Sequence, residues 1–283
     1  MPPESHSGTY ALGHSDRELA RLERQGAIFA SATEDVLRLA GLEPGMRVLD
    51  VGCGAGDVSL IAGGIVGPTG SVIGIDRVDA ALATARRRAA AAGLGWLRFA
   101  TADIDAFDPG EKFDAVIGRF ILMHVPQPSA VIRHLAGHLL PGGIIAFMEL
   151  DIKQTMALPD LPLLDKCLAW ITATYESIGA DPDMGSHLFG AFRSAGLIAE
   201  LHGITRIEGG PDAVAYDFAA ETIRSLLPYM EQFGVATAEE IGLDTLAERL
   251  RRDAVAGNNC IFLPRLVGAW ARVPVTAGAP AAR

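Results

Sequence analysis

Three glycines stand at alternate positions after a short apolar run, in the segment VLDVGCGAGD that covers residues 48–57. Glycine at Gly52, Gly54 and Gly56 permits positive φ angles and lets a ligand approach the backbone without meeting a Cβ atom. The N–H groups that open the following helix can then receive a negatively charged group. The segment therefore predicts a ligand-binding loop, with an ordinary tight turn as the alternative.

The spacing of this loop differs from that of the common phosphate-binding loops. A dinucleotide fingerprint, G-x-G-x-x-G, would need glycine at position 57, where Asp57 stands, and no Gly-Lys-Ser/Thr of a Walker loop is present. An acid at this position repels a pyrophosphate and attracts a cation, so we expect a ligand that carries an ammonium group as well as a carboxylate. The alternative is that Asp57 only interacts with the dipole of the helix that it begins.

Two further acids follow the next two expected strands. A carboxylate at Asp76 can accept both hydroxyls of a ribose and would reject a 2′-phosphate. Asp103 is placed to accept from an exocyclic amine such as that of adenine. An amino acid, a ribose and an adenine in this order along a sheet edge describe S-adenosylmethionine. For both acids, the alternative is plain solvation at the end of a strand.

The elements that would position these acids alternate along the chain. Strands alternating with helices indicate right-handed βαβ units, and therefore a parallel sheet with helices on both faces. The strand interiors are continuous apolar runs, as burial on both faces requires. Asp79 is expected to cap the helix that it opens. We expect strands at 47–51, 71–75, 97–100, 113–118 and 144–150, and helices at 15–41, 58–65, from 79 onward and at 130–140.

Helical patterns dominate the second half of the chain, and Thr245-x-x-Glu248 resembles a capping box. We expect helices at 161–179, 186–196, 213–233 and 237–255, and extended segments at 197–207 and 262–273. A single domain over 1–283 is predicted, divided into an N-terminal helical lid (1–41), a cofactor-binding core (42–151), a helical cap (152–196 and 208–257), two final strands (197–207 and 258–273) and a disordered tail (274–283).

The motifs VLDVGCGAGD, VIGIDRV, ATADIDAF, FDAVIGRFILMHVP and LLPGGIIAFME resemble the successive motifs of the class I S-adenosylmethionine-dependent methyltransferases, over roughly residues 46–151. The resemblance implies an α/β fold: a Rossmann-like, doubly wound, seven-stranded sheet with its last strand antiparallel and a helical cap. It implies that the glycines cradle the methionine part of the cofactor, with S-adenosylhomocysteine as product. The cofactor-binding residues expected are Tyr10, Asp50, Gly52, Cys53, Gly54, Gly56, Asp57, Asp76, Arg77, Asp103, Ile104 and Arg119.

Residues after the fourth and fifth strands are the candidates for catalysis. Arg119 would orient a carboxylate or carbonyl of the acceptor, or pair with Glu149. His124 would act as a base, or be a structural histidine on the cofactor side. Glu149 would pair with a basic nitrogen of the acceptor, or support another residue. A general base is optional, because the sulfonium methyl group is already activated and positioning supplies much of the rate. The sequence does not place His187, His202 and Tyr229 of the cap.

Composition limits the partners. The net charge is −10 without a basic block, and the arginines at 86–88 are expected on a solvated helix face, so a nucleic acid is not expected as partner. No apolar run is long enough for a membrane span. Three scattered cysteines argue for a reducing cytosol and against a disulfide framework or a thiolate zinc site.

These observations predict a cytoplasmic, metal-independent methyltransferase, monomeric or homodimeric, that acts on O, N or an electron-rich carbon of a small organic acceptor. The alternative is a protein of the same fold that binds the cofactor without transferring a methyl group, as a cyclase-like or binding protein. A nicotinamide-dependent oxidoreductase is opposed by Asp57.

Overall fold

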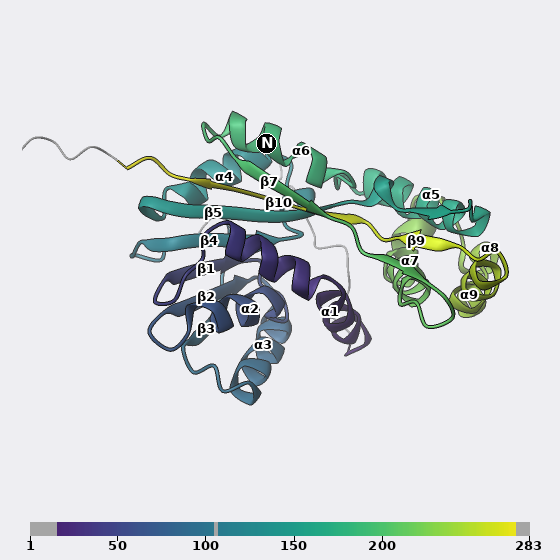
Figure 1. Cartoon of the computed structure of the whole chain (residues 1–283), viewed down its shortest axis with the longest axis horizontal. Coiled ribbons are helices and arrows are strands. Elements are labelled where there is room, and N and C mark those ends of the chain that lie inside the picture. Colours follow the sequence, from purple (N-terminus) through teal and green to yellow (C-terminus); the bar gives the residue numbers. More distant parts are fainter. Residues whose placement is uncertain (1–15, 105–106, 276–283) are drawn as a thin grey trace, which may run out of the picture.

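The computed structural model describes residues 16–104 and 107–275. Tyr10 and residues 276–283 of the predicted tail lie outside this range. Within it, two sheets and the helices around them form the arrangement shown in Figure 1.

The main sheet carries the residues with predicted chemistry. Its strand order is β3-β2-β1-β4-β5-β10-β7, with β10 antiparallel to β5 and β7 and with β1 parallel to β2 and β4. The predicted seven-stranded sheet with an antiparallel last strand is thereby confirmed. The strand order reverses between β1 and β4, which is where such sheets bind ligands. The strands are β1 (Arg47–Val51), β2 (Ser71–Asp76), β3 (Leu97–Thr101), β4 (Phe113–Arg119), β5 (Leu139–Asp151), β7 (Glu200–Ile204) and β10 (Arg265–Arg272).

Helices cover both faces of this sheet (Figure 1). The neighbouring residues Val267 and Gly268 of β10 show the two faces, because the first lies against Gly185 of α6 and the second against Val36 of α1. Helix α6 packs on β5 and β10, although it lies in the segment expected to form the cap. The helices around the sheet are α1 (Asp16–Leu39), α2 (Asp57–Val66), α3 (Asp79–Ala91), α4 (Pro128–Ala136) and α6 (Met184–Ser194).

A cap lies beyond the carboxyl end of β5 (Figure 1). It contains a three-stranded sheet, ordered β6-β9-β8, that the sequence did not predict. The two extended segments expected at 197–207 and 262–273 are each broken, the second at Leu263-Pro264, where proline removes a backbone donor. The cap consists of β6 (Met156–Leu158), α5 (Pro162–Ser177), β8 (Ile207–Gly209), α7 (Ala215–Gln232), α8 (Ala238–Ile241), α9 (Leu246–Ala256) and β9 (Cys260–Phe262).

Two predictions of helix capping are wrong. Thr245 precedes α9, but its hydroxyl makes no capping hydrogen bond and instead donates to the carbonyl of Gly242 at 3.2 Å. A capping box forms at Thr237 and Glu240, one short helix earlier. Asp79 is the first residue of α3 rather than its cap, since Val78 takes the extended conformation before the helix.

The predicted helix at 130–140 is too long. Helix α4 ends at Ala136 and β5 already begins at Leu139, so that residues 141–143 belong to the strand rather than to a turn. Gly142 has a φ of 79°, and the pairing of β5 with β4 is irregular at this point. The glycines therefore allow a bend within a strand, where the sequence indicated the end of a helix.

Candidate functional site

The loop between β1 and α2 has the backbone that its glycines predicted. Gly52, Gly54 and Gly56 have φ angles of 62°, 52° and 85°, in the left-handed region that disfavours any residue with a Cβ atom. A Cβ atom on Gly52 would overlap Ile121, and one on Gly56 would lie 2.9 Å from the Cβ of Ala85. A Cβ atom on Gly54 would have nothing within 4 Å. Packing against Ala85 thus requires glycine at 56, a Cβ atom at 52 would displace the flexible end of Ile121, and Gly54 opens onto free space that a ligand can fill.

Asp76 stands at the end of β2 and holds this loop. Its Oδ2 accepts from the backbone N–H of Gly54 at 2.9 Å, and its Oδ1 accepts from the N–H of Val78 at 2.9 Å. Each carboxylate oxygen has a second lone pair, so both can still accept from neighbouring hydroxyls. The structure therefore brings the predicted ribose acid directly beside the predicted methionine loop.

Arg77 and Asp103 meet at the next strand end. Arg77 Nη1 lies 3.9 Å from Asp103 Oδ2, and both side chains are about half exposed. Ile104 packs partly buried against the core next to them. These three residues, which the family resemblance assigns to the adenine, thus lie together after β2 and β3.

Asp50 lies beneath the loop at the end of β1 and is buried. Its Oδ2 accepts from Ser59 Oγ at 2.5 Å, whereas its Oδ1 has no hydrogen-bond partner within the described residues. Burial raises the pKa of the Asp50 carboxyl to about 7, which the Ser59 hydrogen bond and the charge of Arg119 partly oppose. An unpartnered buried oxygen below an open loop fits a ligand that brings an ammonium group.

The raised pKa makes a prediction about stability. In the folded protein Asp50 keeps its proton up to about pH 7, whereas the ordinary pKa of an aspartate side chain is 3.8. Between these two pKa values the folded state therefore binds more protons at Asp50 than the unfolded chain does. The protonated carboxyl stabilises the folded state at low pH, and this contribution is lost as the pH rises through 7. The free energy of unfolding of the wild type should therefore fall between pH 5 and pH 8. Asp50→Asn keeps an acceptor for Ser59 but cannot titrate, so we expect this fall to be smaller by about 2 to 3 kcal/mol in the variant. Denaturant unfolding of the ligand-free variant at these pH values measures this, and an unchanged pH slope would contradict it.

Asp57 differs from its prediction as a group that awaits a ligand cation. Its side chain lies beside Gly26 of α1, and Oδ1 is 2.7 Å from Arg88 Nη2 while Oδ2 is 3.9 Å from Arg119 Nη2. Two arginines of the chain itself therefore already neutralise this carboxylate.

Arg119 is buried at the end of β4, with 5% of its side chain exposed. Its Nη1 donates to Thr33 Oγ1 of α1 at 2.7 Å, and its guanidinium lies 5.1 Å from the centre of the Phe120 ring. The alternative that it pairs with Glu149 is wrong, because its acidic neighbour is Asp57. Arg119 therefore links the glycine loop to the N-terminal helix.

Glu149 is fully buried near the end of β5, and its side chain accepts hydrogen bonds from backbone N–H groups. Its Oε1 accepts from the N–H groups of Ile121 and Leu122 at 2.9 and 2.7 Å, and its Oε2 has no hydrogen-bond partner within the described residues. Burial raises the pKa of Glu149 to about 8, which these backbone hydrogen bonds partly oppose. At neutral pH this carboxyl is therefore mostly protonated.

His124 and Cys53 are both poor candidates for proton transfer or nucleophilic chemistry. Burial, together with the charge of Arg77, lowers the pKa of His124 to about 4, so the imidazole is neutral and weakly basic at pH 7. Burial, with the charges of Asp50 and Asp76, raises the pKa of the Cys53 thiol, which lies against Gly74. Cys53 thus contributes its small side chain and its backbone to the loop.

The three cap candidates are dispersed. His187 lies in α6 with its Nδ1 2.6 Å from Asp181 Oδ2, His202 lies in β7 of the main sheet, and Tyr229 lies in α7. They form no common site.

Sequence reasoning missed several residues that hold the loop. Arg88, expected on a solvated face, donates to the carbonyl of Ala55 at 2.8 Å and pairs with Asp57. Its position offers a signal, because it lies three residues after the buried Ala85 and directly before the buried Ala89. Thr33, Ser59 and Gly26 have no comparable signature, since their roles follow from contacts between distant segments.

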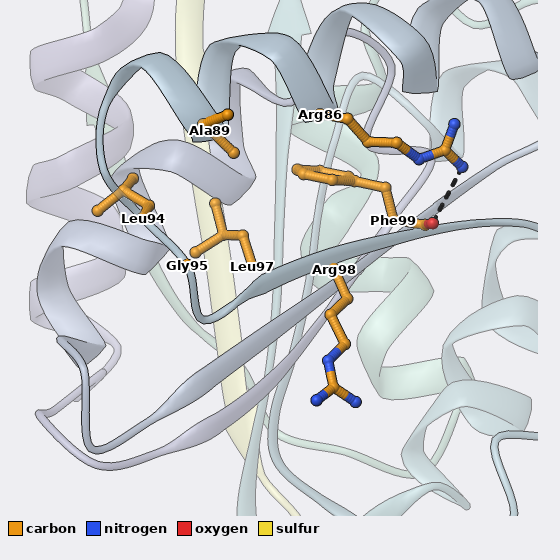
Figure 2. A pocket seen from close by; sticks show the side chains of 8 residues that line it. Arg86, Ala89, Leu94, Gly95, Leu97, Arg98 and Phe99 are labelled. Atoms are coloured by element: carbon orange, nitrogen blue, oxygen red, sulfur yellow. Dashed lines mark hydrogen bonds between the residues drawn. The ribbon is translucent and has the colours of Figure 1, made fainter.

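A shallow groove between α3 and β3 is separate from this site (Figure 2). Leu94, Leu97 and Phe99 contribute apolar side chains to it, and Arg86 donates to the carbonyl of Phe99 at 3.1 Å across it. It lies along the amino-terminal half of β3, whereas Asp76 and Asp103 lie at the carboxyl ends of the strands. The groove therefore lies apart from the acids at the strand ends, although the ring of Phe99, which lines it, also lies close to Gly56 of the glycine loop.

Within residues 16–104 and 107–275, no three or more His, Cys, Asp or Glu side chains are grouped to hold a metal ion. None of the helices in these ranges combines the length and the apolar character needed to cross a bilayer.

Comparison with known proteins identifies the family. A family model described as a methyltransferase domain matches residues 42–184, about half of the chain. The chain is 35% identical over 118 residues to the 2-phytyl-1,4-naphtoquinone methyltransferase of Synechococcus elongatus, covering 40% of this chain and 50% of that protein. It is 32% identical over 162 residues to a ubiquinone/menaquinone biosynthesis C-methyltransferase of Ectopseudomonas mendocina, covering 52% and 63%.

The chain thus spans about half to two thirds of the length of these curated relatives. A solved structure with the same fold is the cyclopropane-fatty-acyl-phospholipid synthase-like protein of Lactobacillus casei, with a TM-score of 0.59, 18% identity, and coverage of 92% of this chain and 95% of that chain. The glycine loop, the acids at the strand ends and the matched family model agree. The chain belongs to the methyltransferase-domain family, among the class I S-adenosylmethionine-dependent methyltransferases.

Proposed function

We propose that the protein transfers a methyl group from S-adenosylmethionine to O, N or an electron-rich carbon of a small organic acceptor. The observation that carries the proposal is the open space at Gly54, whose backbone N–H donates to Asp76 Oδ2. The family and the relatives that methylate quinones support it. A quinol, the electron-rich reduced form of a quinone, is accordingly the acceptor class that we propose first.

The residues would divide the cofactor between them. Gly52, Gly54 and Gly56 would approach its amino-acid part, with Asp50 facing the ammonium group. Asp76 would accept from the ribose hydroxyls. Arg77, Asp103 and Ile104 would flank the adenine. Cys53 and Asp57 complete the loop, and Tyr10 would cover the cofactor.

The cofactor would supply a methyl group already activated on a sulfonium. The chain would align the acceptor with that methyl group and exclude water, and positioning of this kind lowers a barrier by about 7–11 kcal/mol. His124 is too weak a base to remove a proton efficiently at neutral pH. We therefore propose that Arg119, His124 and Glu149 shape the site rather than take protons from the acceptor.

The proposal extends to the setting of the enzyme. We propose a cytoplasmic enzyme, monomeric or homodimeric, that needs no metal and binds neither nucleic acid nor a membrane. The dispersed acidic charge of −10 supports the lack of a nucleic-acid partner.

The direct test is formation of S-adenosylhomocysteine together with a gain of about 14 Da (one CH₂) in an acceptor, followed by mass spectrometry. We expect both products from a panel of naphthoquinols, phenols and amines, with EDTA present. Binding of S-adenosylhomocysteine without turnover on any acceptor would favour the cyclase-like or binding alternative. Methylation confined to an RNA included in the panel would contradict the small-molecule assignment.

A further inference from the structure

The turn that follows β4 has an unfavourable backbone. Phe120 has a φ of 61°, and among the described residues other than glycine only Asn258 shares such an angle. A residue with a Cβ atom is disfavoured in this left-handed region, so the surrounding structure must hold it there. Residues in such conformations cluster where a precise geometry is needed.

Glu149 holds this turn in place through hydrogen bonds. Its Oε1 accepts from the two N–H groups that directly follow Phe120, at 2.9 and 2.7 Å, and the N–H of Phe120 itself donates to the carbonyl of Met148 at 2.9 Å. The side chain is fully buried, and its raised pKa leaves it mostly neutral, so that it needs no counter-ion. One carboxyl of β5 thus fixes the path of the chain after β4.

The residues of this turn reach helix α1. The Phe120 ring packs edge-to-face on Phe29, with ring centres 5.6 Å apart, and Arg119 donates to Thr33, one helical turn further along α1. Phe29 also meets Phe218 of the cap at 6.0 Å. The turn at 119–122 therefore contacts α1 at Phe29 and Thr33, in addition to the packing of α1 on α2 and β10.

We propose that Glu149 is a positioning residue that holds helix α1 over the glycine loop by fixing the turn at 119–122, and so controls the affinity for the cofactor. The link from Glu149 to α1 is independent of the proposed function, whereas the link from α1 to the cofactor rests on that function. Two measurements test the two links separately.

The first measurement is amide hydrogen exchange of α1 in the ligand-free protein. Removing the Glu149 side chain in Glu149→Ala frees the turn, and we expect exchange over residues 26–37 to become at least ten-fold faster. Asp151→Ala is the matched control: Asp151 is an equally buried acid two residues along the strand, but it accepts from Ser186 at 2.6 Å and from Arg265 at 3.0 Å. It should accelerate exchange in α6 and leave α1 within three-fold of the wild type. Equal effects of the two variants on α1 would overturn the proposal.

The second measurement is calorimetric binding of S-adenosylhomocysteine. We expect Glu149→Ala to weaken it at least ten-fold and Asp151→Ala by less than two-fold. Glu149→Gln keeps an oxygen that can accept from Ile121 and Leu122, so it should stay within three-fold of the wild type. A glutamine variant as weak as the alanine variant would overturn the proposal, because the role would then belong to Oε2. If the wild type does not bind the ligand, the proposed function fails while the exchange result still decides the role of Glu149.

Phe120→Ala covers the case in which Glu149→Ala does not fold. It keeps the backbone donors of Glu149 and removes the ring that meets Phe29 and lies beside the Arg119 guanidinium. We expect exchange of α1 to rise at least three-fold and the affinity for S-adenosylhomocysteine to fall at least three-fold. Wild-type values in both measurements would overturn the proposal.

Discussion

Replacing Asp76 by alanine is expected to weaken binding of S-adenosylhomocysteine about 100-fold. The change removes the acceptor proposed for the ribose hydroxyls, and it also frees the N–H of Gly54, which Asp76 Oδ2 holds at 2.9 Å. Hydrogen bonds to a charged group contribute about 1.5 to 3 kcal/mol each, and 100-fold corresponds to about 2.7 kcal/mol. Calorimetry on the purified variant gives the affinity.

Asp79→Ala is the matched control for this prediction. Asp79 is also an acid near the end of β2, but its side chain is 74% exposed and its ion pair is with Arg86 at 3.5 Å. We expect its affinity for S-adenosylhomocysteine to stay within two-fold of the wild type. Wild-type affinity in Asp76→Ala, or an equal loss in both variants, would remove Asp76 from the site.

Arg119→Met is expected to lower the free energy of unfolding by about 2 to 4 kcal/mol and to weaken the binding of S-adenosylhomocysteine at least ten-fold. Methionine keeps the apolar stem but leaves Thr33 without its donor and Asp57 with Arg88 as its remaining ion-pair partner. Losing one partner of a buried charge interaction is strongly destabilising, and the 3.9 Å separation here places the effect toward the lower end. Denaturant unfolding and calorimetry measure the two effects.

Arg86→Met serves as the control, because the Arg86 side chain is 46% exposed and its ion pair with Asp79 is a surface one. We expect it to change the free energy of unfolding by less than about 1 kcal/mol. A variant Arg119→Met that keeps its stability and its affinity for S-adenosylhomocysteine, but raises the KM of an acceptor, would instead return Arg119 to the acceptor-orienting role that the sequence suggested.

The strand ends and the glycine loop on the proposed cofactor side could be predicted from the sequence, because their signals are local. The apolar run before Gly52, the alternate glycines and Asp76 each mark the end of a strand or the start of a helix within a few residues. The structure accordingly places β1 at the predicted residues and puts Asp76 against Gly54.

The partners of the long side chains were harder to predict. Arg119 reaches Thr33, 86 positions away, and Arg88 reaches back to Ala55, and no local pattern records such pairings. The left-handed Phe120 has no signature either, since glycine is the residue that usually marks such an angle. The roles of Glu149 and Arg119 therefore became visible only with the fold.

The small sheet of the cap escaped prediction for a different reason. Its strands, such as β6 (Met156–Leu158), have three residues each, which is too short for a periodic pattern to distinguish a strand from a loop. Their pairing depends on bringing together segments about 50 to 100 positions apart. The cap is also where the acceptor would be selected, so the acceptor has to be found by experiment.

The proposed function requires that the loop after β1 bind the amino-acid end of a methionine-derived nucleoside. A crystal structure of the protein grown with saturating S-adenosylhomocysteine tests this most directly. We predict the amino-acid part against Gly54, its ammonium group within hydrogen-bond distance of Asp50 Oδ1, and both ribose hydroxyls on Asp76. Density for the nucleoside at another place on the chain, or a vacant loop in crystals whose solution affinity ensures occupancy, would contradict the account.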